Sequence, residues 1–326
     1  MPGLFFAIVR AEKPLKSSSP TAVRPSAGVS AAIGGTPLVE LARFGRGAGK
    51  IFAKLEWFNP GGSLKDRIAI AMIEDAEDRS LLAPGGTIVE PTSGNTGVAL
   101  AMLAAAKGYR CVIVMPEGYG KVKALLMEAL GARVVRTPAH DLMTGAIARA
   151  RQLQQETPGA YMPDQFSNPV NPRTHYETTG PEIVEQLGGA IDAFVAGVGT
   201  TGTFCGVARL LSQRWPGLRR VAAEPQGSIL GGGAHAPHRV EGIGLSFFPA
   251  ILDRNLIDEV ITITDEEAFE TCRLLARQEG LLAGGSSGVA AAAALRVARR
   301  LGPGKTVVTI FPDGAERYPD QGIFGN

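Results

Sequence analysis

Short apolar runs alternate with helical patterns along almost the whole chain. The runs TIVEP and CVIVMP, for example, are each followed by a segment with helical periodicity, GVALAMLAAAKG and KVKALLMEALG. Strands that alternate with helices are typical of a parallel sheet covered by helices on both faces. The chain has 326 residues, which is enough for two domains. We therefore expect an α/β protein with two open, mostly parallel sheets that have helices on both faces.

The alternation stops near residue 158, at the Pro- and Asn-rich segment GAYMPDQFSNPVNPRTHY. This segment is predicted as a long loop, and long loops in compact domains are usually functional or connecting. We place a domain change near it. Two α/β lobes with loops at the ends of their strands are expected to form a ligand cleft between them.

Composition and charge narrow the possible partners. The net charge is only +2, so no broad electrostatic field is expected and nucleic acid is not the predicted partner. The three cysteines are far apart, which argues against a disulfide framework or a zinc site and fits a reducing compartment. No apolar stretch reaches membrane-spanning length. We expect a cytoplasmic protein without a metal or a membrane partner, and for its N-terminal segment a transit peptide remains an alternative.

The stretch AGVGTTGTFCG contains a literal G-x-G-x-x-G, from Gly197 to Gly202. An apolar run precedes it, a helical pattern follows, and Glu224 lies near the end of the next apolar run, as in a dinucleotide-binding site. A glycine loop between a strand and a helix nevertheless binds any phosphate. The additional threonine hydroxyls favour a compact phosphate monoester. From these residues alone, an NAD-dependent dehydrogenase remains an alternative.

Three other glycine-rich segments have different interpretations. PTSGNTG, at 91–97, opens a helix and is either a cradle for a carboxylate or phosphate or a polar helix cap. GGSSG, at 284–288, matches a hydrolase elbow, but every histidine precedes it, so its serines are predicted to cap the following helix. GRGAGKI fails as a P-loop because Phe44 and Ile51 occupy positions that need Gly and Ser or Thr.

Lys65, in NPGGSLKDR, is predicted in the first turn of a helix, with Ser63 placed to cap it. The helix dipole and burial would both favour the neutral amine there. A neutral lysine amine is the nucleophile that Schiff-base chemistry needs. The alternative is an ordinary surface lysine at an exposed helix start.

NPGGSLKDR, PTSGNTG, GVGTTGT, VEGIG and GGSSG occur in the order found in the fold-type II pyridoxal-phosphate enzymes, whose fold is tryptophan synthase β-like. Over residues 33–324 the chain resembles the cysteine synthase and cystathionine β-synthase branch. Residues 1–33, rich in Ser, Pro and Ala, are predicted to be a flexible tail. With this resemblance we assign a small substrate-clamping domain to 49–157. Residues 34–48 plus 158–326 form the large domain that binds the cofactor phosphate. The resemblance also implies a homodimer.

The resemblance carries specific roles over to this chain. Lys65 would hold pyridoxal 5′-phosphate as the internal aldimine and act as the general base. Asn95 would hydrogen-bond the ring hydroxyl, and Ser286 would face the pyridine nitrogen. The 5′-phosphate would be bound by Gly199, Thr200, Thr201, Gly202 and Thr203. The substrate would be bound by Thr92, Ser93, Gly94, Asn95, Thr96 and Gln165, with Gly242 and Gly244 lining the cleft.

The implied reaction is β-replacement on O-acetylserine or serine through α-aminoacrylate, with sulfide giving cysteine. The alternative acceptor is homocysteine, as in cystathionine β-synthase, and a β-eliminating desulfhydrase or dehydratase is less favoured. Two departures from the family pattern stand out. Thr201 replaces a common glycine, and we expect it to have an ordinary negative φ because a β-branched residue is costly elsewhere. Pro319 and Asp320 leave the conformation of the segment FPDGAERYPDQG open.

Overall fold

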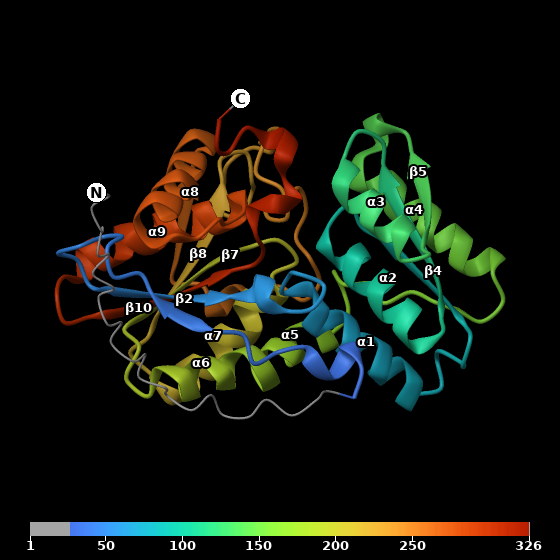
Figure 1. Cartoon of the computed structure of the whole chain (residues 1–326), viewed down its shortest axis with the longest axis horizontal. Helices are drawn as coiled ribbons and strands as arrows, with labels where there is room; N and C mark the ends of the chain where they lie inside the picture. Colours follow the sequence, from blue (N-terminus) through green and yellow to red (C-terminus); the bar gives the residue numbers. More distant parts are fainter. Residues whose placement is uncertain (1–26, 326) are drawn as a thin grey trace, which may run out of the picture.

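The computed structural model describes residues 27–325, so most of the predicted tail at 1–33 lies outside the described residues. Within the described part, the first element is the short 3-10 helix η1 (Val29–Ala32). The chain forms two lobes, which Figure 1 shows beside each other. Each lobe contains one sheet, and all strand pairs are parallel except the one between the first two strands. The expected α/β class with two mostly parallel sheets is confirmed.

The large lobe contains a six-stranded sheet. Its strands, in spatial order, are β1 (Leu38–Glu40), β2 (Lys50–Leu55), β10 (Thr306–Phe311), β7 (Ala193–Gly197), β8 (Arg219–Pro225) and β9 (Glu259–Ile263). One face packs against α8 (Asp265–Glu279) and α9 (Gly285–Leu301), and the other against α6 (Gly180–Leu187) and α7 (Gly202–Arg214). Successive residues of β7 therefore enter different cores, and all of its apolar side chains are buried.

The small lobe contains a four-stranded sheet, in the order β5 (Arg133–Thr137), β4 (Arg110–Pro116), β3 (Thr87–Pro91) and β6 (Ala160–Tyr161). One face is covered by α1 (Lys65–Asp78), α2 (Asn95–Lys107) and α3 (Lys121–Ala129), and the other by α4 (Leu142–Glu156). The remaining short elements are η2 (Glu56–Phe58), η3 (Ala139–Asp141), α5 (Val170–Thr174), η4 (His175–Thr179), η5 (Arg254–Leu256), η6 (Ala315–Arg317) and η7 (Pro319–Gln321).

The domain boundary predicted at residue 49 is wrong. Strand β2 falls inside the range assigned to the small domain, but it pairs with β10 in the large sheet, with Phe52 opposite Val308. Its residues Ile51, Ala53 and Leu55 are buried in the core of the large lobe. At the other boundary, β6 joins the small sheet although it lies beyond residue 157. The segment predicted there as a loop also contains α5 and part of η4.

Within residues 27–325, no helix is long and apolar enough to cross a membrane. In the same part of the chain, no cluster of three His, Cys, Asp or Glu side chains is arranged to hold a metal ion. The three cysteines are free and buried.

Candidate active site

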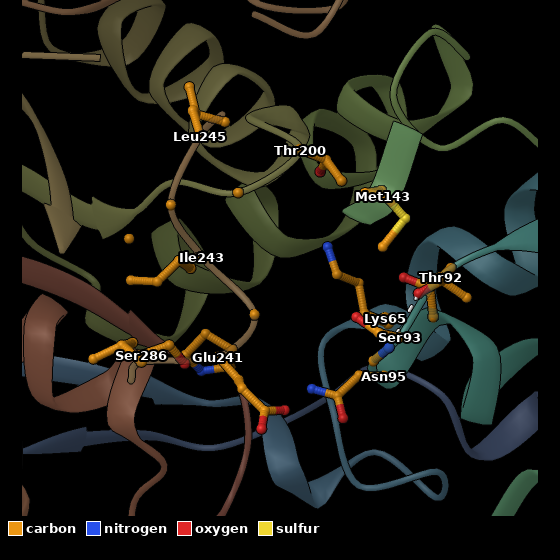
Figure 2. A pocket seen from close by; sticks show the side chains of 18 of the residues that line it. Lys65, Thr92, Ser93, Asn95, Met143, Thr200, Glu241, Ile243, Leu245 and Ser286 are labelled. Atoms are coloured by element: carbon orange, nitrogen blue, oxygen red, sulfur yellow. Dashed lines mark hydrogen bonds between the residues drawn. The ribbon is translucent and has the colours of Figure 1, made fainter. Parts of the chain in front are cut away.

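A cleft of about 430 Å³ is lined by residues of both lobes and of the C-terminal segment (Figure 2). Of the predicted site residues, only Gly202 does not line it; this glycine begins α7 directly behind the lining residues. The structure therefore brings together Lys65, Thr92, Ser93, Gly94, Asn95, Thr96, Gln165, Gly199, Thr200, Thr201, Thr203, Gly242, Gly244 and Ser286. We call residues 92–96 the carboxylate loop and residues 199–203 the phosphate loop.

Lys65 is the first residue of α1, as predicted, and its backbone N–H donates to Ser63 Oγ at 3.2 Å. Its side-chain amine points into the cleft (Figure 2). Burial lowers the pKa of Lys65 from 10.5 to about 8, although the charge of Asp313 opposes that shift. The amine is therefore much closer to its neutral, nucleophilic form at neutral pH than an ordinary lysine.

The phosphate loop contradicts one expectation. Thr201 has φ 72°, in the left-handed region, and not the ordinary negative φ that was predicted. The loop must turn sharply from β7 into α7, and Thr201 is the residue that immediately precedes the helix. Its hydroxyl is buried and, within the described residues, has no hydrogen-bond partner other than the weakly interacting Cys205 thiol. A buried, unsatisfied hydroxyl at a helix start fits a bound anion.

The phosphate loop also lies close to the loop that carries Gly242. A Cβ atom at Gly199 would come within 2.7 Å of the Gly242 carbonyl oxygen. Any larger residue at position 199 would push the two loops apart, because a real Cβ does not approach a carbonyl so closely. The glycine at position 199 therefore allows the phosphate loop to pack directly against the loop that carries Gly242.

Two buried residues that sequence reasoning missed support the phosphate loop. His175 lies in the π-helix η4, with its Nε2 3.1 Å from Thr203 Oγ1 and its Nδ1 2.9 Å from Thr179 Oγ1. Burial, with the nearby charge of Lys65, lowers the pKa of His175 well below its usual value, so the ring is neutral. Asn171 donates to Thr200 Oγ1 at 3.2 Å and to the Gln165 carbonyl oxygen at 2.8 Å. The segments NPVNP and HYETT were the available signals for these residues.

The carboxylate loop follows β3 and opens α2, so its backbone N–H groups and hydroxyls lie at a helix N-terminus. Thr96 donates to Gln165 Oε1 at 2.7 Å, so these two predicted residues are in direct contact. Glu90, fully buried at the end of β3, accepts from the N–H groups of Asp164 at 2.9 Å and Gln165 at 3.1 Å. Asp164 has φ 49°, so this carboxylate holds a strained turn that brings Gln165 to the cleft.

Asn95 makes contacts that the sequence analysis did not predict. Its amide donates to Asp313 Oδ2 at 2.6 Å and accepts from Arg317 Nη1 at 2.9 Å. Both partners belong to the C-terminal segment whose conformation was left open.

Ser286 lines the cleft on the wall opposite Lys65 (Figure 2). The predicted capping role of Ser286 and Ser287 is wrong. The N-cap of α9 is Gly284, both serines lie within the first turn, and in the described structure no side chain caps this helix. Ser286 is therefore available to a group in the cleft.

Glu224 does not face the cleft as an acid that holds a ribose would. Its carboxylate accepts from the N–H groups of Leu230 at 3.0 Å and Gly231 at 2.9 Å. These contacts shape the loop after β8, and they remove the acid on which the dinucleotide interpretation depended.

The family model for pyridoxal-phosphate dependent enzymes matches residues 29–313. This chain belongs to that family. The residues of this pyridoxal-phosphate dependent enzyme fit the cofactor: a half-buried amine of lowered pKa lies in one cleft with a phosphate loop that carries a buried hydroxyl without an oxygen or nitrogen partner among the described residues. The fit also explains the literal dinucleotide motif, since one phosphate needs the loop but no ribose partner.

Relatives of this pyridoxal-phosphate dependent enzyme include a cysteine synthase of Staphylococcus aureus, 48% identical over 300 residues, covering 91% of this chain and 96% of the relative. A cystathionine beta-synthase of Apis mellifera is 46% identical over 314 residues, covering 93% of this chain and 62% of that protein. Among solved structures, an O-acetylserine dependent cystathionine beta-synthase from Helicobacter pylori superposes with a TM-score of 0.88 at 44% identity, covering 93% of this chain and all of the other, 100%.

Proposed function

We propose that this enzyme catalyses β-replacement on O-acetylserine, or on serine, with sulfide as the nucleophile and L-cysteine as the product. The position of Lys65 carries the proposal. Its half-buried amine, of lowered pKa, shares one cleft with the phosphate loop and the carboxylate loop. The 48% identity to the S. aureus cysteine synthase supports this choice of reaction.

In this proposal each loop binds one end of the reacting system. The phosphate loop, from Gly199 to Thr203, binds the cofactor phosphate. The carboxylate loop and Gln165 bind the carboxylate of the amino-acid substrate. Asn95 donates to the ring hydroxyl of the cofactor, and Ser286 faces the ring nitrogen. Lys65 holds the cofactor covalently between turnovers.

Pyridoxal phosphate, when bound, supplies the electron sink that stabilises negative charge at the substrate α-carbon. Lys65 Nζ would take the proton from the substrate α-carbon. The β-substituent would leave the β-carbon with its bonding electrons, as acetate from O-acetylserine or hydroxide from serine. Hydrosulfide would then bond to the β-carbon, and Lys65 Nζ would return the proton to the α-carbon. A positioned base of this kind contributes roughly 10²–10⁴-fold to the rate. The lowered pKa of Lys65 lets a large fraction of the amine act as a base at neutral pH.

Ser286 favours elimination chemistry. A serine hydroxyl is neutral and does not protonate the ring nitrogen as a carboxylic acid would. The electron sink is then weaker, so negative charge at the α-carbon is less stabilised. Prompt loss of the β-substituent is therefore favoured over a long-lived carbanion. The Thr96–Gln165 hydrogen bond joins the small lobe to the segment after β6. Closure of the carboxylate loop and Gln165 over the bound substrate would exclude water.

Cystathionine synthesis is the second candidate. The cleft extends beyond the carboxylate loop to Tyr119, Leu142 and Met143, which provides room for an acceptor larger than sulfide. The likeness to an O-acetylserine dependent cystathionine beta-synthase also favours this candidate. Here homocysteine replaces sulfide as the nucleophile, and the roles of the residues are unchanged.

One assay separates the candidates. The purified holoenzyme is given O-acetylserine or serine, each with sulfide or homocysteine, and the products are identified by mass spectrometry. Cysteine from O-acetylserine and sulfide, formed with the highest kcat/KM, supports the leading proposal. Cystathionine alone would replace it with the second candidate. Pyruvate alone would show a β-eliminating enzyme and contradict both.

We also propose that the enzyme acts in the cytoplasm as a homodimer. Three free, buried cysteines fit a reducing compartment, and the family resemblance suggests the dimer. Sedimentation of the purified protein tests the oligomeric state: a mass near twice the monomer's 34.1 kDa supports the dimer, and a mass near 34.1 kDa contradicts it.

A further inference from the structure

The C-terminal segment that follows β10 lies between the two loops that lead into α1 at Lys65 and into α9 just before Ser286. The N–H of Leu64 donates to the Pro312 carbonyl oxygen at 3.0 Å, and the N–H of Gly284 donates to the Asp313 carbonyl oxygen at 3.1 Å. Isolated bridges join Ser63 to Asp313 and Ala283 to Gly314. The backbone around Asp313 therefore has a fixed position relative to both walls of the cleft.

Two side chains of this segment hold opposite ends of the Asn95 amide. Asn95 Nδ2 donates to Asp313 Oδ2 at 2.6 Å, and Asn95 Oδ1 accepts from Arg317 Nη1 at 2.9 Å. A guanidinium can only donate, so it must face the amide oxygen. An ionised carboxylate can only accept, so it must face the amide nitrogen. The two contacts together permit one orientation of the amide and exclude the flipped one.

Arg317 also contacts the loop that leads to Lys65. Its Nη2 donates to the carbonyl oxygen of Gly61. The guanidinium occupies the space beside Gly62, which has φ 75° and where a Cβ atom would overlap it. The side chain of Arg317 is largely buried. One arginine thus fixes the position of the Lys65 loop relative to the Asn95 side chain.

The Asp313 oxygen that accepts from Asn95 also accepts a second hydrogen bond. The Tyr318 hydroxyl donates to the same Oδ2 that accepts from Asn95, and Lys123 Nζ lies 4.1 Å from the centroid of the Tyr318 ring. Burial raises the pKa of Asp313, while the hydrogen bonds from Tyr318 and Asn95 oppose that rise. A proton on the other oxygen, Oδ1, would leave Oδ2 an acceptor, so the Asn95 contact persists in either protonation state.

An asparagine amide has two N–H donors, and Asp313 takes one of them. The other has no partner among the residues that the structure describes, and Asn95 lines the cleft on the same wall as Lys65 and Ser93 (Figure 2). We propose that Arg317 and Asp313 are positioning residues, which fix the Asn95 amide so that this second N–H faces the ring hydroxyl of the cofactor. The inference rests on the role of Asn95 in the proposed function, and it assigns roles to two residues outside the predicted site.

The absorption spectrum of the holoenzyme tests this inference without any turnover. Bound pyridoxal phosphate has two absorption bands whose ratio depends on whether its ring hydroxyl is ionised, and an N–H donor at that oxygen favours the ionised form. We expect Asn95→Ala to change the band ratio by about two- to tenfold, as for loss of one hydrogen bond. Arg317→Met is expected to change it in the same direction. In the double variant Arg317→Met/Asn95→Ala, the ratio should equal that of Asn95→Ala alone.

Two further variants complete the test: a matched control at Arg273 and a second substitution, at Asp313. Arg273 also donates to the C-terminal segment, at the Ile323 carbonyl oxygen, but lies away from the cleft, so Arg273→Met should leave the spectrum unchanged. Asp313→Ala removes the acceptor at the other end of the amide, and it should shift the ratio in the same direction even if Arg317→Met does not fold.

Three outcomes would overturn the inference. A shift in Arg317→Met that adds to the shift of Asn95→Ala would mean that Arg317 acts by another route. Spectra of Arg317→Met and Asp313→Ala that match wild type, beside a shifted Asn95→Ala, would mean that neither residue orients the amide. An unshifted Asn95→Ala would show that Asn95 does not contact the hydroxyl. The β-replacement assay is independent of these results, so a failure here is distinguishable from a failure of the proposed reaction.

Discussion

Lys123 of helix α3 and Glu241 of the loop after β8 both line the cleft and form an ion pair, with 2.5 Å between Nζ and Oε2. The lysine side chain is almost fully buried, and that of the glutamate is 35% exposed. The two residues belong to different lobes. The ion pair therefore favours the arrangement in which the lobes are close together.

Loss of this ion pair should weaken substrate binding. Lys123→Met removes the attraction across the cleft and leaves Glu241 without its partner, so the open arrangement gains population. We expect KM for the amino-acid donor to rise by about two- to tenfold with a smaller change in kcat, equivalent to roughly 0.4–1.4 kcal/mol. Steady-state kinetics check this. Lys121→Met, at an exposed position on the same helix, is the matched control. An unchanged KM in Lys123→Met would show that the ion pair does not contribute to closure.

The lowered pKa of Lys65 predicts a pH-dependent stability difference in the apoprotein. A lysine with a folded-state pKa of about 8 and an ordinary value of 10.5 destabilises the fold fully below pH 8, and the cost disappears as pH rises toward 10.5. Apo Lys65→Met should therefore be more stable than the wild-type apoprotein at pH 7, by on the order of 3 kcal/mol. The difference should shrink between pH 8 and pH 10.5.

Denaturant unfolding of the two apoproteins from pH 7 to pH 10.5 measures this difference. Lys50→Met, at the exposed start of β2, controls for replacement of a lysine by methionine. A Lys65→Met variant that is equally or less stable at pH 7 would mean that the amine is well solvated or well paired in the apoprotein.

Thr201→Gly should separate backbone strain from cofactor binding. A threonine at φ 72° is strained, and glycine relieves that strain, partly offset by its greater freedom in the unfolded chain. We expect the apoprotein to gain on the order of 1 kcal/mol of unfolding free energy. The loss of the buried hydroxyl should weaken cofactor binding by about two- to tenfold.

Thr201→Ser is the control for this pair of effects, because it keeps the hydroxyl that glycine removes. Denaturant unfolding and cofactor titration of the apoprotein give the two measurements. Tighter cofactor binding in Thr201→Gly than in wild type would contradict a role for the hydroxyl at the phosphate.

The raised pKa of Glu90 predicts a second effect of pH on stability. Burial raises the pKa of Glu90 from 4.5 to about 8, although N–H groups of Gln165 and Asp164 oppose the rise. A raised folded-state pKa means that this carboxyl group contributes decreasing stability as pH rises from 4.5 through 8. Glu90→Gln should flatten the dependence of unfolding free energy on pH across that range.

The same variant should alter substrate binding. Glutamine has only one acceptor oxygen in its amide, so one of the two N–H groups held by Glu90 loses its partner. Gln165 should then be less well placed, and KM for the donor should rise by about two- to tenfold. Glu156→Gln, on the exposed end of α4, is the control. Wild-type kinetics and an unchanged pH dependence in Glu90→Gln would contradict this account.

Local motifs allowed most of the site to be predicted from the sequence. Lys65 and the two loops were proposed because each lies at a strand end or helix start with a recognisable composition, whereas the role of Ser286 came only from the family resemblance. The φ of Thr201 was predicted wrongly because the turn between β7 and α7 overrides the preference of a β-branched residue. Propensity describes what a residue prefers, and the surrounding fold can impose another conformation.

The remaining features depend on contacts between distant parts of the chain. Strand β2 belongs to the large lobe because it pairs with β10, a strand near the other end of the sequence. Arg317 and Asn95 are 222 positions apart, and no local pattern relates them. His175 and Asn171 lie in a segment that read as a loop because of its Pro and Asn content. Their function emerges only when the fold places them behind the phosphate loop.

The most direct test of the account is to map the cofactor attachment site. The yellow holoenzyme is reduced with borohydride, digested, and its peptides are analysed by mass spectrometry. We expect pyridoxyl phosphate on the peptide that contains Lys65, on no other lysine, and a Lys65→Ala protein without the colour or the label. Stable attachment at another lysine, or a colourless wild-type protein that binds NAD, would contradict it.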